Sequence, residues 1–343
     1  MTPIPADAPD SGASFGSEPD DASGSVGDPA EALRVPPASD AARPPRDTLP
    51  RGSRTRFAPA PTGQLHLGHL VNIVYTWGIA RATGGSVVLR VEDHDRQRSR
   101  REHEVALLLD LARLGLVADE PSPDAFAAST PYRQSDAGDV YQAAVDRLRG
   151  AGLVYACDCS RSTFAAWAAE HGRPWHGVGC PGGCRGRDLP GDGVGLRVAV
   201  GAGSERWGDL LAGPMIDEPA SAGDLLVRDR VGNWTYVLCV VVDDLRQGID
   251  LVIRGRDLLQ ATAGQIRLGR LLGRETPASF LHHPLVRHES GRKLSKADAD
   301  TSISSMLDAG NTPGELLGLA ARLAGLQTDP TPIEPSALAG LFA

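Results

Sequence analysis

Residues 54–70 read RTRFAPAPTGQLHLGHL. The first four residues predict a short strand, APAPTG predicts a turn, and apolar residues at helical spacing predict a helix over residues 67–82. Downstream, the sequence predicts strands at 86–91, 153–156, 195–200, 224–228, 236–242 and 251–254, and helices over 102–114, 139–149 and 258–272. The βαβα order of the first elements predicts an α/β fold, with a parallel sheet and helices on both of its faces.

Composition changes near residue 50. Residues 1–50 hold ten of the 26 prolines and nine acidic residues against three arginines, so they carry −6 of the total net charge of −8. Such a segment cannot bury enough apolar surface to offset its ordering entropy, and we expect a disordered extension. No apolar run is long enough for a membrane span. The first residues, MTPIPADAPDSG, show no basic stretch followed by an apolar one, so we do not expect a signal peptide. We therefore expect a soluble, cytoplasmic monomer with no membrane partner.

The turn between the first strand and the first helix is a candidate nucleotide site. Ligands of open parallel sheets bind at the carboxyl ends of strands, where a helix amino terminus offers free N–H groups to phosphates. His66 and His69 are three residues apart and can both face that end, while Gly63 and Gly68 let a nucleotide approach the backbone. By itself, this pair of histidines is more often typical of helix capping, of packing or of one half of a metal site.

The chain has only two lysines, Lys293 and Lys296, in the segment GRKLSKAD at residues 291–298; its other basic residues are arginines. An ammonium is a compact charge on a flexible stem, whereas a guanidinium is a rigid planar fork. A Gly-flanked loop with two ammonium groups suits a leaving pyrophosphate, whose charge grows in the transition state. An ordinary basic surface loop is the alternative interpretation.

Four of the five cysteines form two close pairs within 28 residues. These are Cys157, Cys159, Cys180 and Cys184. The spacing is typical of a closed, structural zinc site, and a disulfide framework or free thiols is the alternative. His171 and His176 could each replace one of the four ligands, but they lie outside the two pairs. Cys239 lies in an apolar run, and we expect it in the core.

RFAPAPTGQLHLGHL, followed far downstream by RKLSKAD, resembles the paired HIGH and KMSKS signatures of class I aminoacyl-tRNA synthetases. LRVEDHD, YVLCVVVDDLRQGIDLVIRGRDLL and HHPLVRHESGRKLSK resemble the glutamyl branch of that class, and the resemblance extends over residues 54–325. It implies a Rossmann-like catalytic domain over residues 51–296, a zinc-binding segment at about 155–190, and a helical segment over 297–343. It also implies that Mg-ATP is bound by His66, Gly68, His69, Lys293 and Lys296.

The same resemblance implies a glutamate pocket. Arg56 and Arg254 match the arginines that bind carboxylates, for which the guanidinium fork is suited. Glu92 matches the acid that holds the substrate ammonium, and Tyr236 matches a tyrosine of the same pocket. The backbone segment implied at the substrate comprises Phe57, Ala58, Pro59 and Ala60, the last of which replaces the usual serine of the family. VEDHD, where the glutaminyl branch normally has FDDTN, favours glutamate.

Two further features indicate which members of the glutamyl branch the chain resembles. Small glutamyl-synthetase paralogues carry C-x-C…Y-x-x-x-C, and here Cys180 replaces the tyrosine, which gives four thiolates and a site charge that Arg161, Arg185 and Arg187 can offset. Only 47 residues follow Lys296, whereas an anticodon-binding region needs on the order of 100 residues.

The chain thus resembles the truncated paralogues, which activate L-glutamate and attach it to queuosine in the anticodon of tRNA(Asp). Three alternatives remain. Two lie within the same fold: a stand-alone glutamate adenylator and a minimal glutamyl-tRNA synthetase. The third is a zinc-stabilised RNA-binding module without catalysis, which the intact set of catalytic-site residues disfavours.

Overall fold

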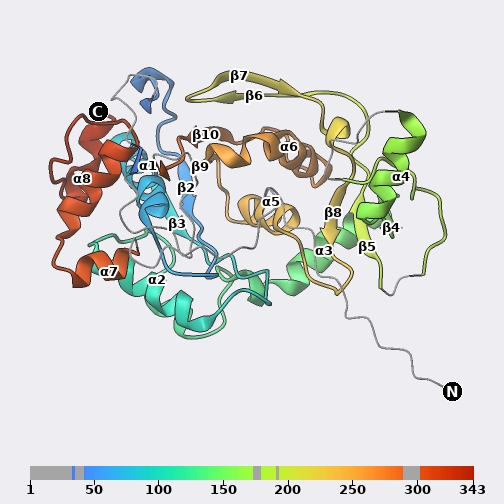
Figure 1. The fold of residues 1–343 in the computed structure, drawn as a ribbon, viewed down its shortest axis with the longest axis horizontal. Coiled ribbons are helices and arrows are strands. Elements are labelled where there is room, and N and C mark those ends of the chain that lie inside the picture. Colours follow the sequence, from blue (N-terminus) through green and yellow to red (C-terminus); the bar gives the residue numbers. More distant parts are fainter. Residues whose placement is uncertain (1–32, 35–41, 173–178, 191–192, 289–301) are drawn as a thin grey trace.

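The computed structural model describes residues 33–34, 42–172, 179–190, 193–288 and 302–343 (Figure 1). Its helices are α1 (Leu67–Thr83), α2 (Arg101–Arg113), α3 (Gly138–Gly150), α4 (Arg161–His171), α5 (Tyr236–Arg246), α6 (Thr262–Leu271), α7 (Ile303–Asp308) and α8 (Pro313–Leu323). Its strands are β1 (Leu33–Arg34), β2 (Arg54–Phe57), β3 (Ser86–Leu89), β4 (Val154–Cys157), β5 (Gly195–Val198), β6 (Glu205–Asp209), β7 (Gly213–Asp217), β8 (Leu225–Arg228), β9 (Leu251–Gly255), β10 (Ser279–His283) and β11 (Arg287–His288). Among the described helices, none has the length and apolarity needed to traverse a lipid bilayer.

The predicted parallel arrangement forms the centre of the molecule. β2 pairs with β3, and β10 pairs with both β9 and β6, all in parallel. The amide of Asp250, just before β9, donates to the carbonyl of Arg54 at 3.1 Å, so β2 and β9 lie side by side. The carboxyl ends of β2, β3 and β9 therefore face the same edge, which is where ligands bind in such sheets.

Antiparallel strands complete the architecture, so the sheets are mixed rather than purely parallel. β7 pairs antiparallel with β6 at one edge of the central sheet. β4, β5 and β8 form a separate antiparallel sheet, which lies with α4 to the right of the central strands in Figure 1. This second sheet carries the first two cysteines at the end of β4.

The predicted strand at residues 236–242 is wrong, because these residues form the first turns of α5. Every residue from Val237 to Asp244 is buried, with α3, α6 and β8 packed around the helix. A short apolar run that is buried on all sides shows no polar face, and its periodicity cannot separate a strand from a helix. Cys239 is fully buried in this core, as predicted.

The core around α1 includes both ends of the described chain. α8 and the 3-10 helix Pro335–Leu341 pack on α1, so both share one core with the central strands. Residues 42–50 also belong to this body: Ala42 and Leu49 are buried, and the Tyr75 hydroxyl donates to the carbonyl of Ala42 at 2.5 Å. The prediction of a disordered extension is therefore wrong for residues 42–50.

Candidate active site

The turn after β2 is fixed to the segment after β3 by backbone hydrogen bonds. The amides of Arg90 and Glu92 donate to the carbonyls of Phe57 and Pro59 at 3.0 and 3.1 Å. The Phe57 side chain is buried against Trp77 in the core, with ring centroids 5.4 Å apart, and its role is packing. The neighbouring alanines at positions 58 and 60 are partly exposed. The turn thus holds Glu92 beside the carboxyl end of β2.

The two histidines cap the amino terminus of α1. The Nδ1 atom of His66 accepts from the Gly68 amide at 3.1 Å, and the Nδ1 atom of His69 accepts from the His66 amide at 3.1 Å. The rings lie 4.1 Å apart, and a Cβ on Gly68 would come within 2.9 Å of the His66 ring. Because Nδ1 of each neutral ring is an acceptor, the proton lies on Nε2. Capping therefore leaves Nε2–H of each ring as its donor group.

Lys293 and Lys296 lie outside the described residues. The chain after them is described from Ser302, which forms an antiparallel bridge with His66. The amide of Ile303 donates to the carbonyl of Leu65 at 2.9 Å. Ser302 and Ile303 therefore lie directly beside the amino terminus of α1.

The two predicted carboxylate-binding arginines lie on neighbouring strands. Arg56 is on β2 and Arg254 is on β9, and both are buried. One terminal nitrogen of Arg56 donates to the carbonyl of Ile253 at 3.1 Å, and its Nε donates to Asp244 at 3.2 Å. Arg56 is thus fixed against β9, with a carboxylate of the protein as its partner.

Tyr236 and Glu92 complete this group of charges. Tyr236 begins α5, and burial is the main cause that raises the pKa of its hydroxyl, with Arg254 opposing it and Glu92 reinforcing it. The structure therefore places Tyr236 within electrostatic range of both charged groups. Glu92 is buried and its Oε1 accepts from Arg90 at 2.9 Å. Residues matched to one pocket by sequence alone are thus close in space.

Arg254 is held by neutral groups. Its Nε donates to His282 at 3.0 Å, and its terminal nitrogens donate to Gln265 at 2.6 Å and to Thr262 at 2.7 Å. Within the part of the chain that the structure describes, no carboxylate lies within 4 Å of this guanidinium. Burial, followed by the repulsion of Arg56, lowers its pKa, although Tyr236 opposes the shift. A buried guanidinium without a carboxylate partner is suited to an anionic ligand.

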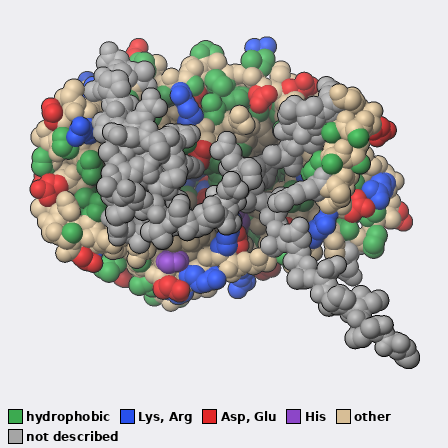
Figure 2. All heavy atoms as spheres, viewed as in Figure 1, with side chains coloured by type: hydrophobic (Ala, Val, Ile, Leu, Met, Phe, Trp, Pro, Cys, Tyr) green, Lys and Arg blue, Asp and Glu red, His purple; other side chains and the backbone are tan. Residues whose placement is uncertain are grey.

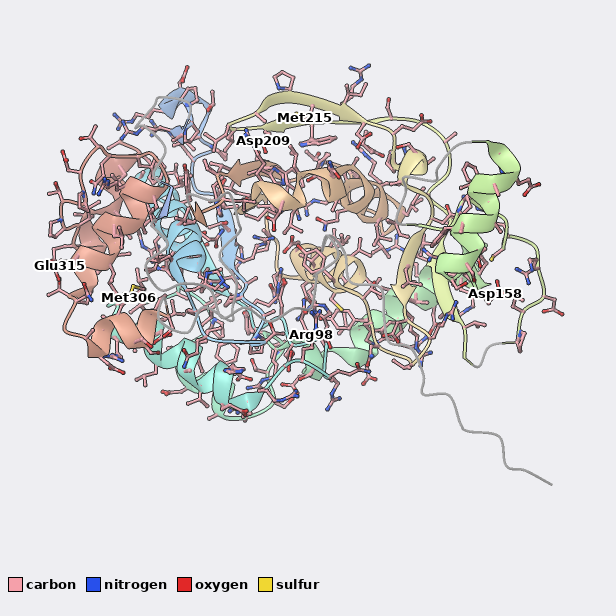
Figure 3. All side chains as sticks on the ribbon, viewed as in Figure 1. Arg98, Asp158, Asp209, Met215, Met306 and Glu315 are labelled. Atoms are coloured by element: carbon pink, nitrogen blue, oxygen red, sulfur yellow. The ribbon has the colours of Figure 1, made fainter. Side chains whose placement is uncertain are left out.

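His282 orients Arg254 through a buried relay. Its Nδ1 lies 2.6 Å from the carboxylate of Asp209, which is labelled on β6 in Figure 3. Burial lowers the pKa of His282, so the ring is neutral near pH 7. Its single proton is donated to Asp209, which leaves Nε2 as the acceptor for Arg254. Sequence analysis did not identify this relay, although His282 lies within the HHPLVRHES stretch.

Arg90, which sequence analysis also missed, connects the carboxylates of the pocket. It is fully buried and donates to Glu92 and to Asp244, each at 2.9 Å, with Asp243 at 3.7 Å. Burial alone lowers its pKa, but the carboxylates of Asp244, Glu92 and Asp243 outweigh burial and raise it. Arg90 therefore stays charged. It fixes Glu92 and, through Asp244, the position of Arg56.

We expect Arg90→Met to lower the free energy of unfolding by about 3 kcal/mol or more, because buried carboxylates lose their shared cation. Urea denaturation monitored by circular dichroism measures this loss. Arg98→Met is the matched control, because Arg98 is exposed and pairs with Asp95 at the surface. It is expected to cost less than about 1 kcal/mol. Equal denaturation midpoints for the two variants would contradict the assigned role of Arg90.

The four clustered cysteines converge on one point. Their sulfurs all lie within 4.8 Å of one another, and Cys159 is 3.6 Å from Cys180 and 3.4 Å from Cys184. A tetrahedron with metal–sulfur bonds of about 2.3 Å has edges of about 3.8 Å, so this arrangement fits zinc. All five cysteines are free thiols. Of the two candidate histidines, His171 stacks on Trp167 away from the cluster, and His176 lies outside the described residues.

Two arginines donate to sulfurs of the cluster, and only one of the two, Arg187, was expected from the sequence. Arg197, which sequence analysis missed, is buried and donates to the Cys157 sulfur at 3.0 Å. The pKa of Cys157 is lowered by a hydrogen bond from Cys159 and by the charge of Arg197. Arg187 donates to Cys184 at 3.6 Å and to Asp158, which Figure 3 labels beside α4. Arg185 pairs instead with Asp224, a carboxylate of the surrounding shell.

The parallel sheet, the capped histidine pair and the buried arginines together define a class I synthetase catalytic domain. The family of class I tRNA synthetases (E and Q), catalytic domain, matches residues 53–173 and 185–331, and the chain belongs to this family.

Two relatives indicate which branch of this family the chain is most similar to in sequence and length. The chain is 39% identical over 296 residues to a glutamyl-Q tRNA(Asp) synthetase of Symbiobacterium thermophilum, covering 84% of this chain and 91% of that protein. It is 38% identical to a glutamyl-Q tRNA(Asp) synthetase of Rhodobacter capsulatus, covering 79% of this chain and 99% of that protein.

Two solved structures of proteins named as glutamate–tRNA ligases or synthetases are similar to this chain in fold. A glutamate tRNA ligase of Elizabethkingia meningosepticum, crystallised in complex with its amino acid, superimposes with a TM-score of 0.67 at 25% identity. The match covers 79% of this chain and 60% of that one. A glutamate-tRNA synthetase of Elizabethkingia anophelis gives a TM-score of 0.66 at 25% identity, over 79% of this chain and 61% of that one. The chain thus spans about three fifths of these two ligases.

Proposed function

We propose that this chain activates L-glutamate with Mg-ATP and transfers it to queuosine in the anticodon of tRNA(Asp), acting as a monomer in the cytoplasm. The observation that carries the glutamate assignment is Arg254, a buried guanidinium with neutral neighbours and no carboxylate within 4 Å among the described residues. Bound glutamate supplies the missing anion. Glutamine would leave the buried Arg254 guanidinium without an anionic partner, so the pocket favours glutamate over glutamine.

The remaining groups fit the other parts of the substrate. Arg56 binds the second carboxylate of the substrate, and Asp244 keeps the Arg56 side chain in place. Glu92 faces the substrate ammonium with Oε2, since its Oε1 accepts from Arg90. Tyr236 lines the space between them. In the activation step an oxygen of the α-carboxylate bonds to the α-phosphorus of ATP. The bond from that phosphorus to the bridging oxygen breaks, and pyrophosphate leaves with both electrons.

The phosphates belong at the amino terminus of α1. There the Nε2–H groups of His66 and His69 can donate to phosphate oxygens, and the positive end of the helix dipole favours negative charge. Lys293 and Lys296 are assigned to the departing pyrophosphate, with Gly68 allowing the close packing of the histidine pair. In the transfer step a hydroxyl of the queuosine cyclopentene diol attacks the glutamyl carbonyl, and AMP leaves. The names of the two relatives support this acceptor.

Radioactive glutamate tests the acceptor. We expect label on queuosine-containing tRNA(Asp), located by nuclease mapping on the anticodon fragment and not on the terminal adenosine. Glutamate-dependent ATP–pyrophosphate exchange is expected to proceed without any RNA. The control is tRNA(Asp) that lacks queuosine, which is expected to remain unlabelled. Equal labelling of this control, or label on the terminal adenosine of tRNA(Glu), would identify a minimal glutamyl-tRNA synthetase instead.

We also propose that Cys157, Cys159, Cys180 and Cys184 hold one structural zinc ion. The sulfur spacing fits a tetrahedral ion, and four thiolates leave no open position for substrate or water. The positive charge of Arg197 partly offsets the net −2 of such a site. The zinc would join the end of β4 to the segment that carries Cys180 and Cys184.

One zinc per chain is therefore expected to co-purify with the protein, measured by atomic emission on the native enzyme. Cys180→Ser is expected to lower zinc content and thermal stability, because a hydroxyl is a poorer ligand than a thiolate. Cys239→Ala is the control, since Cys239 lies in the core of α5 away from the cluster, and it is expected to keep one zinc. Native protein without zinc, or with four thiols that react readily, would contradict the site.

A further inference from the structure

An arginine-rich cavity of about 550 Å³ lies next to the glutamate pocket. It begins at Pro61, in the turn after β2, and extends across the turn after β3 to the start of α2. Its lining contains four arginines and two acidic residues. These are Arg96, Arg100, Arg101, Arg133, Asp93 and Glu104. The lining is thus net positive in a chain whose total charge is −8.

Two of these arginines have no carboxylate partner in the described structure. Arg101 and Arg133 both pair with Glu104, the latter at 2.7 Å. The side chain of Arg96 is exposed and makes no hydrogen bond or ion pair with any described residue, while its amide donates to the carbonyl of His94 at 3.1 Å. Arg100 is exposed, and its side chain donates only to the backbone carbonyls of Gln97 and Ser99 in the same turn, at 2.7 and 2.9 Å. Positive charge therefore remains available at the rim of the cavity.

The rim is held in place relative to the active site. The amide of Arg100 donates to the carbonyl of Pro61 at 3.0 Å, which ties the turn to the segment that leads into α1. The carboxylate of Asp95 accepts from the amides of Gln97 and Arg98 at 3.2 and 3.3 Å. Figure 3 labels Arg98 above α2 in the lower half of the view, and Figure 2 shows Lys/Arg side chains together with Asp/Glu side chains along the lower edge.

We propose that this cavity binds backbone phosphates of the RNA substrate, with Arg96 and Arg100 as the contacting groups; the proposal rests on the proposed function. A guanidinium bonds two phosphate oxygens at once, and such contacts position RNA without reading its sequence. An open cavity of this size accepts more than one phosphate group. Because Pro61 and Asp93 adjoin the glutamate-binding segments, RNA bound here lies close to the activated amino acid.

The test is the double variant Arg96→Ala/Arg100→Ala, with Arg46→Ala/Arg51→Ala as a charge-matched control. Arg46 and Arg51 are exposed, and Arg51 precedes β2, so it lies toward the opposite edge of the sheet. Fluorescence anisotropy measures the Kd of queuosine-containing tRNA(Asp) over a range of salt concentrations. We expect the test variant to bind about tenfold more weakly at low salt. For two lost phosphate contacts, the slope of log Kd against log salt falls by about 1.4–1.8.

Glutamate-dependent exchange without RNA is expected to match wild type in both double variants, since neither touches the glutamate or ATP groups. An unchanged Kd and salt slope in Arg96→Ala/Arg100→Ala overturns the inference. So does a raised KM for ATP with unchanged tRNA binding, which would assign the cavity to the nucleotide. Binding is also measured with tRNA(Asp) lacking queuosine. If the acceptor assignment alone is wrong, labelling of queuosine fails while the salt-slope difference between the variants remains.

Discussion

Arg254→Ala is expected to lower kcat/KM for glutamate-dependent ATP–pyrophosphate exchange by about 10²–10⁴-fold, the equivalent of about 3–5 kcal/mol for breaking a buried ion pair. The physical reason is the position of this guanidinium, which is buried and hydrogen-bonded to the neutral groups of His282, Gln265 and Thr262. Its charge is therefore directed to the substrate. The wild-type enzyme is expected to show weak or undetectable exchange with glutamine, and Arg254→Ala to lose most of this discrimination.

Two further variants separate binding from folding. Arg254→Lys keeps the charge but not the planar fork, so we expect exchange well below wild type with native circular dichroism. Arg206→Ala, on the exposed face of β6, is the matched control and is expected to retain full exchange. Wild-type kcat/KM in Arg254→Ala, or equal use of glutamine and glutamate by the unaltered enzyme, would show that the pocket is assigned incorrectly.

Lys296→Ala is expected to lower kcat of exchange by about 10²–10³-fold, the usual cost of removing one group that stabilises charge in a transition state. KM for glutamate is expected to change little, because the pyrophosphate charge develops only as the α-phosphorus bond breaks. Lys296→Arg is expected to be impaired as well, since the two cations differ in shape. Ser302, six residues after Lys296, lies beside His66, which supports this assignment.

Lys293→Ala provides the comparison for Lys296→Ala, being the same substitution three residues earlier. We expect a smaller loss of kcat, because the second lysine of the motif is the one assigned to the departing pyrophosphate. Near-normal exchange in Lys296→Ala would remove the basis for this assignment. Single-turnover measurements of adenylate formation distinguish a slow chemical step from slow release of pyrophosphate.

The sequence by itself determined the local features of this protein. The strand, turn and helix over residues 54–83 follow from a Pro- and Gly-rich turn placed between a short strand and a helical apolar pattern. The cysteine spacing likewise predicted the four-sulfur cluster. The residues matched by motif, such as Arg56 and Arg254, fall on adjoining strands because strand ends of a parallel sheet meet at one edge.

Only the tertiary structure decided the features that depend on contacts between distant segments. Arg90 binds Asp244 across 154 positions of sequence, and His282 joins Asp209 to Arg254, so no local pattern could reveal either relay. No local pattern could reveal the contact of Arg197 with the Cys157 sulfur either, because the two residues are distant in sequence. α5 formed a helix where a strand was predicted, because burial on all sides removes the polar face that periodicity requires. Residues 42–50 read as disordered by composition, but α1 supplies the apolar surface against which Ala42 and Leu49 pack.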